Sequence, residues 1–205
     1  MRLFFYYCTP GFSNCYVLGT DEGVTPAEAV IVDPGSIDSS LIHRIEDNGY
    51  DLRGVFVTHD HRVHVNGLRT LKRIYDVEIF AVNDTVSDFP ATRIKDGDTV
   101  SAGPFRIEVL CVPGHSSDSA VFLVDRLLFT GDAMTSGLVG PTASAYGSAT
   151  QMLKLRGRVL SLPGDYTVLP GHGPPSSLEA ERRFNADIAN YRDARTLRRN
   201  FRTDP

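Results

Sequence analysis

The sequence predicts a layered α/β fold in which mixed β-sheets lie between outer helices. Short runs rich in Val, Ile, Phe and Tyr recur along the 205 residues and are bounded by Gly, Pro, Asp and Asn, as β-strands are. Helical patterns separate only some of these runs, so the chain is strand-rich, then alternating, then strand-rich, then helical. A simple parallel sheet would need an even alternation, which favours mixed sheets instead. The length suits one compact domain, residues 1–205.

Nine runs predict strands. The apolar run at the N-terminus could be mistaken for a secretion signal. It is short, and no small-residue cleavage site follows it, so we interpret it as a strand. No 18 consecutive residues are apolar, so no membrane span is expected. The predicted strands are Leu3–Tyr7, Cys15–Leu18, Ala29–Val32, Gly54–Thr58, Glu78–Val82, Phe105–Val112, Ala120–Val124, Leu127–Thr130 and Thr167–Leu169.

Apolar residues at helical spacing predict four helices. The last of them would begin at a capping box, Ser176-Ser177-Leu178-Glu179, and would form an arginine-rich C-terminal helix over about 177–203. The predicted helices are Ile37–Asn48, His64–Tyr75, Ala149–Leu162 and the stretch from Leu178 onward.

The arginines of the C-terminal stretch have two interpretations: a basic arm for nucleic acid, or the solvated face of an amphipathic helix. Acidic residues dilute the charge and favour the second, with Phe184, Ile188, Tyr191 and Leu197 packed inward. Ala186 would let the helix continue past Asn185, which suggests a packing or dimer role. We expect a monomer or a homodimer.

Composition narrows the function. A net charge of −4 and a pI near 5.8 argue against nucleic-acid binding and leave a small molecule as the expected partner. The three cysteines are too few and too scattered for a disulfide framework or a cysteine-based zinc site. Reduced thiols are typical of a cytoplasmic protein, which is the expected location.

Histidines cluster where strands end. His59 and His61 stand two apart in an extended segment, so their rings point the same way, and His64 follows as the chain turns into a helix. Two Pro-Gly-His turns and one Gly-Asp pair follow later strands and present His115, His172 and Asp132. Imidazole and carboxylate ligands suit zinc, iron or similar metals. The sixth histidine, His43, is expected on the surface of a helix.

These motifs, in this order, resemble those of the metallo-β-lactamase superfamily. Thr58 to His64 meets the family's T-H-x-H-x-D-H, and His115, Asp132 and His172 meet its later ligands. The resemblance implies a four-layer αββα sandwich with two mixed β-sheets flanked by helices, and a metal site at one edge between the sheets. It also implies that Asp33, in a strand-end Asp-Pro-Gly, supports the ligands from behind.

By the same resemblance, His59, His61 and His115 would hold a first metal, and Asp132 would bridge to a second. His64 and His172 would complete the second site. Zinc is the favoured metal, with iron or manganese as alternatives.

One residue departs from this pattern, since Val63 stands where the family has an Asp that binds the second metal. Val has no lone pair, so one tight metal and at most a weak second are expected. Asp60 lies between two ligands in an extended segment and should point away from them. A single zinc can still activate water near neutral pH.

The surroundings look most like small hydroxyacylglutathione hydrolase (glyoxalase II) proteins, judging by Phe12-Ser13-Asn14-Cys15 and Gly171-His172-Gly173-Pro174. The family's glutathione-holding loop is here 137–147, and it contains no Lys or Arg. Arg62 and Tyr146 are the remaining candidates for substrate contacts.

Three functions stay open at this stage. The first is a metal-dependent hydrolase of thioesters or esters. The second is a mononuclear non-haem iron oxygenase acting on a thiol or persulfide, and the third is a non-catalytic binding module of the same fold. Metal content and oxygen uptake would separate them.

Overall fold

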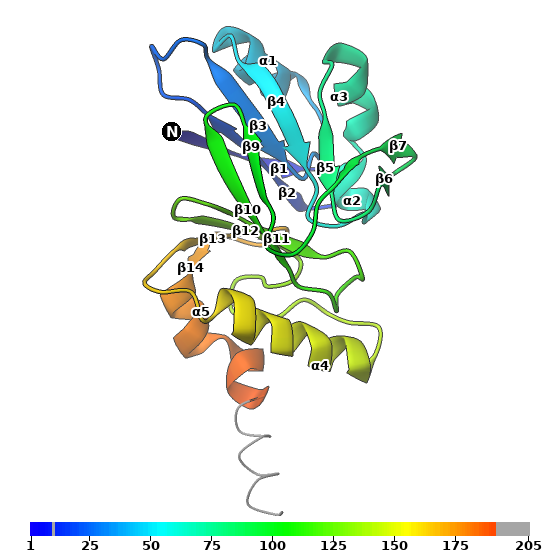
Figure 1. Ribbon diagram of the computed structural model, residues 1–205, viewed down its shortest axis with the longest axis vertical. Helices are drawn as coiled ribbons and strands as arrows, with labels where there is room; N and C mark the ends of the chain where they lie inside the picture. The colour runs from blue at the N-terminus through cyan, green and yellow to red at the C-terminus, as the bar shows by residue number, and fades with distance from the viewer. Residues whose placement is uncertain (10, 192–205) are drawn as a thin grey trace, which may run out of the picture.

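The computed structural model describes residues 1–9 and 11–191 and contains two six-stranded sheets packed face to face (Figure 1). The order in the first sheet is β1-β2-β3-β4-β5-β8, with parallel pairing from β3 to β8 and antiparallel pairing before it. The order in the second is β14-β13-β12-β11-β10-β9, where only β12 and β13 are parallel. Both sheets are therefore mixed, as predicted.

All nine predicted strands are present, with shifts at their ends. Five short strands, β6 to β9 and β14, were not predicted, because runs of two to four partly exposed residues carry little alternation. The strands are β1 (Arg2–Cys8), β2 (Ser13–Gly19), β3 (Glu28–Val32), β4 (Asp51–Phe56), β5 (Ile79–Ala81), β6 (Thr85–Val86), β7 (Phe89–Pro90), β8 (Thr92–Arg93), β9 (Thr99–Ala102), β10 (Phe105–Cys111), β11 (Ala120–Val124), β12 (Leu127–Gly131), β13 (Thr167–Pro170) and β14 (Ser176–Ser177).

Helices cover the outer faces of both sheets: α1 and α3 lie on one side of the sandwich, and α4 and α5 lie on the other (Figure 1). No helix in the described part of the chain has the length and apolar character needed to cross a bilayer. The helices are α1 (Ser39–Asp47), α2 (Arg62–Val65), α3 (Leu68–Ile74), α4 (Ala145–Lys154), the π-helical turn η1 (Leu155–Val159) and α5 (Leu178–Phe184).

The core has three apolar layers, which confirms the four-layer sandwich. Alternate residues of one strand face different layers, as the pleat requires. In β2, Val17 packs toward α1 and α3, whereas Tyr16 and Leu18 pack between the two sheets. In β11, Phe122 lies between the sheets and Val121 faces the layer formed with α4 and α5.

Three helix predictions were wrong in detail. The predicted helix Ala149–Leu162 begins at Ala145, where the Ser144 side chain caps it, and ends in the π-helical turn at Val159. The predicted helix His64–Tyr75 is two helices, because the chain turns at Asn66–Gly67, where the Gly67 N–H donates to the Pro34 carbonyl (2.8 Å). A Cβ on Gly67 would collide with that same strand-end loop. The close approach of the two segments therefore sets the break.

The start of α5 also differs from the prediction. Its N-cap is Ser177, which accepts from the Ala180 N–H (3.1 Å), one residue later than expected. Ser176 instead pairs in β14 and donates to the buried carboxylate of Glu181 (2.5 Å). Because Ser176 pairs with Val168 of β13, it is part of a strand and does not cap the helix.

The C-terminal helix does not continue through residue 185. Asn185 adopts an extended conformation, and helix resumes over residues 186–191. Ile188 is buried and Tyr191 packs on the core, as predicted, but Phe184 is 78% exposed. The break at Asn185 rotates Phe184 out of the apolar stripe. Leu197 and most of the arginine-rich stretch lie outside the described residues.

Candidate metal centre

Six candidate ligands meet at one edge of the sandwich, where strands from both sheets end. His59, His61 and His64 follow β4 of the first sheet. The other three follow strands of the second sheet: His115 comes after β10, Asp132 after β12 and His172 after β13. The Ala120 N–H donates to the Thr58 carbonyl (2.9 Å) and joins the two sheets beside this edge. His43, by contrast, is exposed on α1, as expected.

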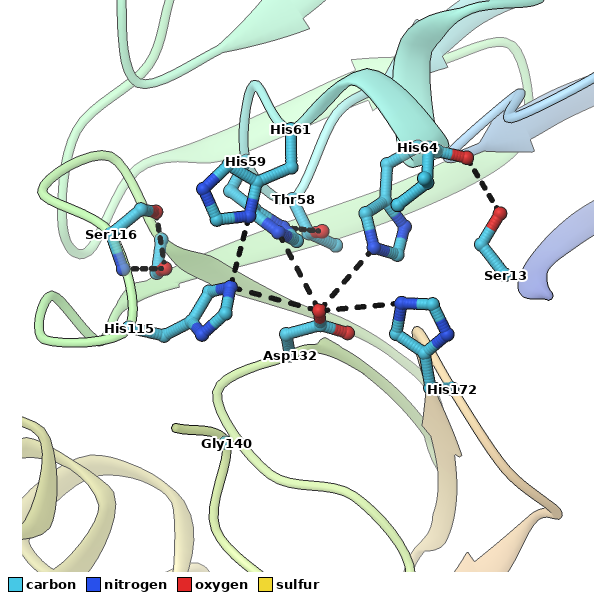
Figure 2. Close-up of polar contacts among 12 residues, drawn as sticks. Ser13, Thr58, His59, His61, His64, His115, Ser116, Asp132, Gly140 and His172 are labelled. Carbon is cyan, nitrogen blue, oxygen red and sulfur yellow. Dashed lines mark hydrogen bonds and ion pairs between the residues drawn. The ribbon is translucent and has the colours of Figure 1, made fainter. Parts of the chain in front are cut away.

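Asp132 is at the centre of the cluster, with histidines above it and on its left and right in the view of Figure 2. One carboxylate oxygen, Oδ2, lies between 3.5 and 3.8 Å from the Nε2 atoms of four histidines. These are His59 (3.8 Å), His64 (3.5 Å), His115 (3.6 Å) and His172 (3.5 Å).

The ligand atoms fall into two groups that share Asp132. In each group, one atom from every residue lies within 4.8 Å of the others. The four-residue group contains His59, His61, His115 and Asp132, and the three-residue group contains His64, Asp132 and His172. The structure thus brings together all six predicted ligands, in the two sets that the resemblance implied.

Hydrogen bonds to main-chain carbonyls orient the rings of His115 and His172. The Nδ1 of His115 donates to the Pro141 carbonyl (2.7 Å), and the Nδ1 of His172 donates to the Phe12 carbonyl (2.9 Å). Carbonyls only accept, so both Nδ1 atoms carry the proton and both Nε2 atoms keep their lone pair.

Asp33 lies behind the other two buried rings, those of His59 and His64. Its carboxylate accepts from the Thr58 N–H (2.8 Å) and from the Thr58 hydroxyl (2.6 Å). Because that hydroxyl proton is committed to Asp33, Thr58 Oγ1 accepts from His59 Nδ1 (3.0 Å). Asp33 Oδ2 also lies 3.4 Å from His64 Nδ1. The structure therefore places Asp33 where the resemblance expected it.

Burial and charge together decide the protonation of the centre. Burial, followed by repulsion from His64, lowers the pKa of His59 to about 4, so this ring is neutral near pH 7. Burial, followed by repulsion from His115, lowers the pKa of His61. For His64 and Asp132, burial opposes the charged forms, but the contacts of His64 with Asp132 and Asp33, and those of Asp132 with His64 and His172, outweigh it. The pKa of His64 is therefore raised and that of Asp132 is lowered.

Some of these atoms are buried without any partner among the described residues. They are the Nε2 atoms of His59 and His64, the Nδ1 atom of His64 and the Oδ1 atom of Asp132. An unpaired buried polar atom costs about 1–3 kcal/mol, so such atoms normally have a partner. Lone pairs of imidazole and carboxylate that face one point fit a divalent transition metal.

The segment Phe12-Ser13-Asn14 holds both sides of the second group, a role that sequence reasoning did not assign. The Ser13 hydroxyl donates to the Val63 carbonyl (2.6 Å), beside His64. The buried Asn14 side chain donates to the carbonyls of Pro170 (2.9 Å) and Gly173 (2.8 Å), on either side of His172. The N–H of Asn14 also donates to the Gly171 carbonyl (2.8 Å).

Two acidic residues near the C-terminus hold the loop that orients His115, and sequence reasoning missed both. The buried Glu181 carboxylate accepts from the Gly137 N–H (3.1 Å), and Asp187 accepts from the Val139 N–H (2.8 Å). Pro141, two residues further on, receives the His115 hydrogen bond. No local sequence signal links these positions, because they are 44 and 48 residues apart.

Val63 packs beneath the β1–β2 turn. A Cβ on Gly11 would lie 2.8 Å from Val63 Cγ1, and Gly11 has a φ of +116°, so the turn passes directly over this side chain. Asp60 does not replace the missing carboxylate, since its Oδ2 accepts from the Ser87 N–H (3.0 Å) in the β6–β7 hairpin. Asp60 thus points away from the ligands, as predicted.

The two predicted substrate contacts lie at the surface. Arg62 is exposed at the start of α2, and Tyr146 is 82% exposed near the start of α4. Within the described residues, neither side chain makes a hydrogen bond or an ion pair with the six ligands. The structure leaves both without an assigned role.

Gly171 offers a direct test of the crowded centre. A Cβ there would lie 2.7 Å from His64 Cε1 and would also press on Asp132 Oδ1. We expect Gly171→Ala to weaken metal binding by about 10- to 100-fold, as loss of ligand orientation does. Gly157→Ala is the matched control, because a Cβ at that helical position meets no atom within 4 Å. Calorimetric metal titration measures the effect, and equal affinities in the two variants would contradict the geometry.

Comparisons with known proteins find similar sequences and similar folds. The model of the metallo-beta-lactamase superfamily matches residues 8–172. A hydroxyacylglutathione hydrolase of Tolumonas auensis is 34% identical over 149 residues, which are 71% of this chain and 57% of that protein. The hydroxyacylglutathione hydrolase GloC of Haemophilus influenzae is 28% identical over 84% of this chain and 91% of its own length. The protein TTHA1623, solved in a di-iron-bound form, superposes with a TM-score of 0.74 at 26% identity, covering 89% of this chain and 98% of that one.

Proposed function

Since the chain belongs to the metallo-β-lactamase superfamily, we propose that it is a metal-dependent hydrolase of thioester or ester substrates. One observation carries the proposal: four histidine Nε2 atoms surround a single carboxylate oxygen at distances of 3.5–3.8 Å. In the described part of the chain, two of these Nε2 atoms are buried without a partner. Such a set has little structural purpose other than to bind a metal.

The protein's own residues would select, orient and enclose the metal. His59, His61, His115 and Asp132 would hold the first metal, and His64 and His172 with Asp132 would hold a weaker second. When bound, a metal of this kind supplies a Lewis acid and a water of lowered pKa. Zinc fits the donor set best, and iron is the alternative that the di-iron neighbour supports.

Around the metals, the remaining residues have separate tasks. Asp33, acting through Thr58, would keep His59 in the tautomer that exposes Nε2, while the Pro141 and Phe12 carbonyls would do the same for His115 and His172. The Asp33 carboxylate also lies 3.4 Å from His64 Nδ1. His59 and His64 are buried and excluded from solvent. The His172 side chain is 35% exposed, so the centre is open to substrate on that side.

Unequal metal binding is the first expected result. The first group has four protein ligands and the second only three, one of them shared. Metal titrated into the stripped protein should therefore occupy one tight site and a second site at least about 10- to 100-fold weaker. Calorimetry with elemental analysis of the loaded protein measures both. Two equally tight sites would show that another group replaces the missing carboxylate.

A second expected result concerns glutathione. The curated relatives named above are hydroxyacylglutathione hydrolases. In this chain, however, the loop 137–147 has no Lys or Arg to meet the carboxylates of glutathione. We expect S-lactoylglutathione to be hydrolysed no faster than an uncharged thioester of similar reactivity. A kcat/KM more than about tenfold in favour of the glutathione substrate would contradict this and would reveal a binding group elsewhere.

An iron oxygenase acting on a thiol or persulfide is the second candidate, because two histidines and Asp132 form the ligand set of non-haem iron sites. Protein isolated without added metal separates the two candidates. Zinc content with thioester hydrolysis supports the hydrolase, whereas iron content with oxygen uptake supports the oxygenase. A protein that binds metal but shows neither reaction would be a binding module.

A further inference from the structure

Large apolar side chains stand exposed beside the second metal group. Phe12 is 64% exposed and Tyr7 is 55% exposed, and their ring centroids are 6.0 Å apart. The pair lies at the end of the β1–β2 hairpin, and we call Tyr7 and Phe12 the aromatic ledge. The Phe12 carbonyl accepts from His172 Nδ1 (2.9 Å), so the main chain that carries this ring contacts a candidate ligand.

The ledge is held in place at a conformational cost. Phe12 has a φ of +57°, a left-handed conformation that bulky side chains rarely adopt. Such strain persists where the surroundings over-determine it and often marks a functional site. Here the hydrogen bonds of Ser13 and Asn14 to the ligand loops fix the turn. An aromatic ring exposed on a rigid, strained turn is suited to contact a ligand and adds nothing to the core.

The surface around this corner carries little charge. Residues 7–14 contain no charged side chain, and neither does the loop 137–147 on the other side of the centre. Val63, which packs under Gly11, replaces the one carboxylate that the family would place here. Leu138, 52% exposed, adds a further apolar side chain on the loop that orients His115. The exposed arginine at position 62 is the exception.

We propose that the aromatic ledge binds an uncharged apolar arm of the substrate, so that the enzyme acts on thioesters or esters with a medium-length alkyl chain. This inference rests on the proposed hydrolase function and adds its substrate class. The arm is either the acyl chain or the alkyl group of the leaving thiol or alcohol.

Two series of uncharged thioesters test the proposal and distinguish the two arms. The first is S-acyl-N-acetylcysteamine with acetyl, butanoyl, hexanoyl and octanoyl groups, and the second is thioacetate esters of alkyl thiols of increasing length. A fully buried methylene is worth about fourfold in binding, so a chain lying on an exposed ledge should gain about twofold per methylene in kcat/KM. We expect this gradient in one of the two series.

Phe12→Asn removes the ring while keeping a residue that tolerates the left-handed conformation and a carbonyl for His172. The ratio of octanoyl to acetyl kcat/KM, or its counterpart in the thiol series, should fall to near one in this variant. Tyr7→Ser should reduce it in part. Phe184→Ala, which removes another exposed phenylalanine, from α5, should leave the ratio at the wild-type value.

A binding measurement separates this inference from the proposed function. The metal-free protein is titrated with S-octyl-N-acetylcysteamine, a thioether that cannot be hydrolysed, and with its S-ethyl counterpart. Tighter binding of the octyl compound, lost in Phe12→Asn, supports the ledge even if the loaded enzyme hydrolyses nothing. Hydrolysis without a gradient in either series overturns the ledge and leaves the hydrolase standing. A chain-length gradient that survives in Phe12→Asn also overturns the ledge. So does a wild-type homodimer that shows no gradient and dissociates on Phe12→Asn, because the two rings would then form a dimer contact.

Discussion

Val63→Asp should give the protein a second tight metal site. The substituted residue precedes His64, and its main chain is already fixed by the Ser13 hydroxyl, so a carboxylate would replace one apolar side chain without a change of loop. A fourth ligand for the second group should raise its metal affinity by at least about 10- to 100-fold. Hydrolysis of simple thioesters should rise with it, because two-metal sites stabilise attacking and leaving groups together.

Calorimetric titration and elemental analysis measure the effect of Val63→Asp. Val63→Thr, which has the same shape but no carboxylate, and Asp60→Asn, which removes the carboxylate bound to Ser87, should both leave metal stoichiometry unchanged. His59→Ala should abolish binding at the first site in the same assay. Unchanged metal content and rate in Val63→Asp would mean that this loop does not direct position 63 toward the second group.

Asp132→Asn should disable both metal sites at once. The Asp132 carboxylate is the shared member of the two groups and lies within 3.8 Å of four imidazole nitrogens. An amide is neutral and a poor metal ligand, so the metal affinity of each site should fall by more than about 100-fold. This exceeds the loss expected on removing a residue that only hydrogen-bonds to a ligand. Thioester hydrolysis should fall to background.

Thermal melting gives a readout of Asp132→Asn that does not depend on activity. Metal at 100 times its Kd should stabilise the wild-type protein by about 2.7 kcal/mol and raise its Tm, whereas the variant should show no such rise. Asp118→Asn is the control, because Asp118 is a neighbouring buried carboxylate that accepts from the Asp60 N–H and belongs to neither group. A variant that still binds one metal tightly would show that the remaining histidines suffice.

Nine strands, the helical segments, the layered α/β class and the histidines at strand ends could be predicted from the sequence, and the family resemblance assigned the six ligands to two metals. These features were predictable because period-two and period-3.6 apolar patterns are local, and because ligands at strand ends stand beside Gly and Pro signals that are also local. The motif from Thr58 to His64 also identified Val63 as the departure.

The tertiary structure decided which groups support that centre. The tautomers of the histidines depend on Asp33, Thr58, Phe12 and Pro141, and the His115 loop depends on Glu181 and Asp187. The break at Asn185 and the shifted cap at Ser177 likewise follow from contacts with distant strands and loops. Hydrogen bonds between segments tens of residues apart leave no periodic trace in a sequence, because each partner is chosen by where the folded chain brings it.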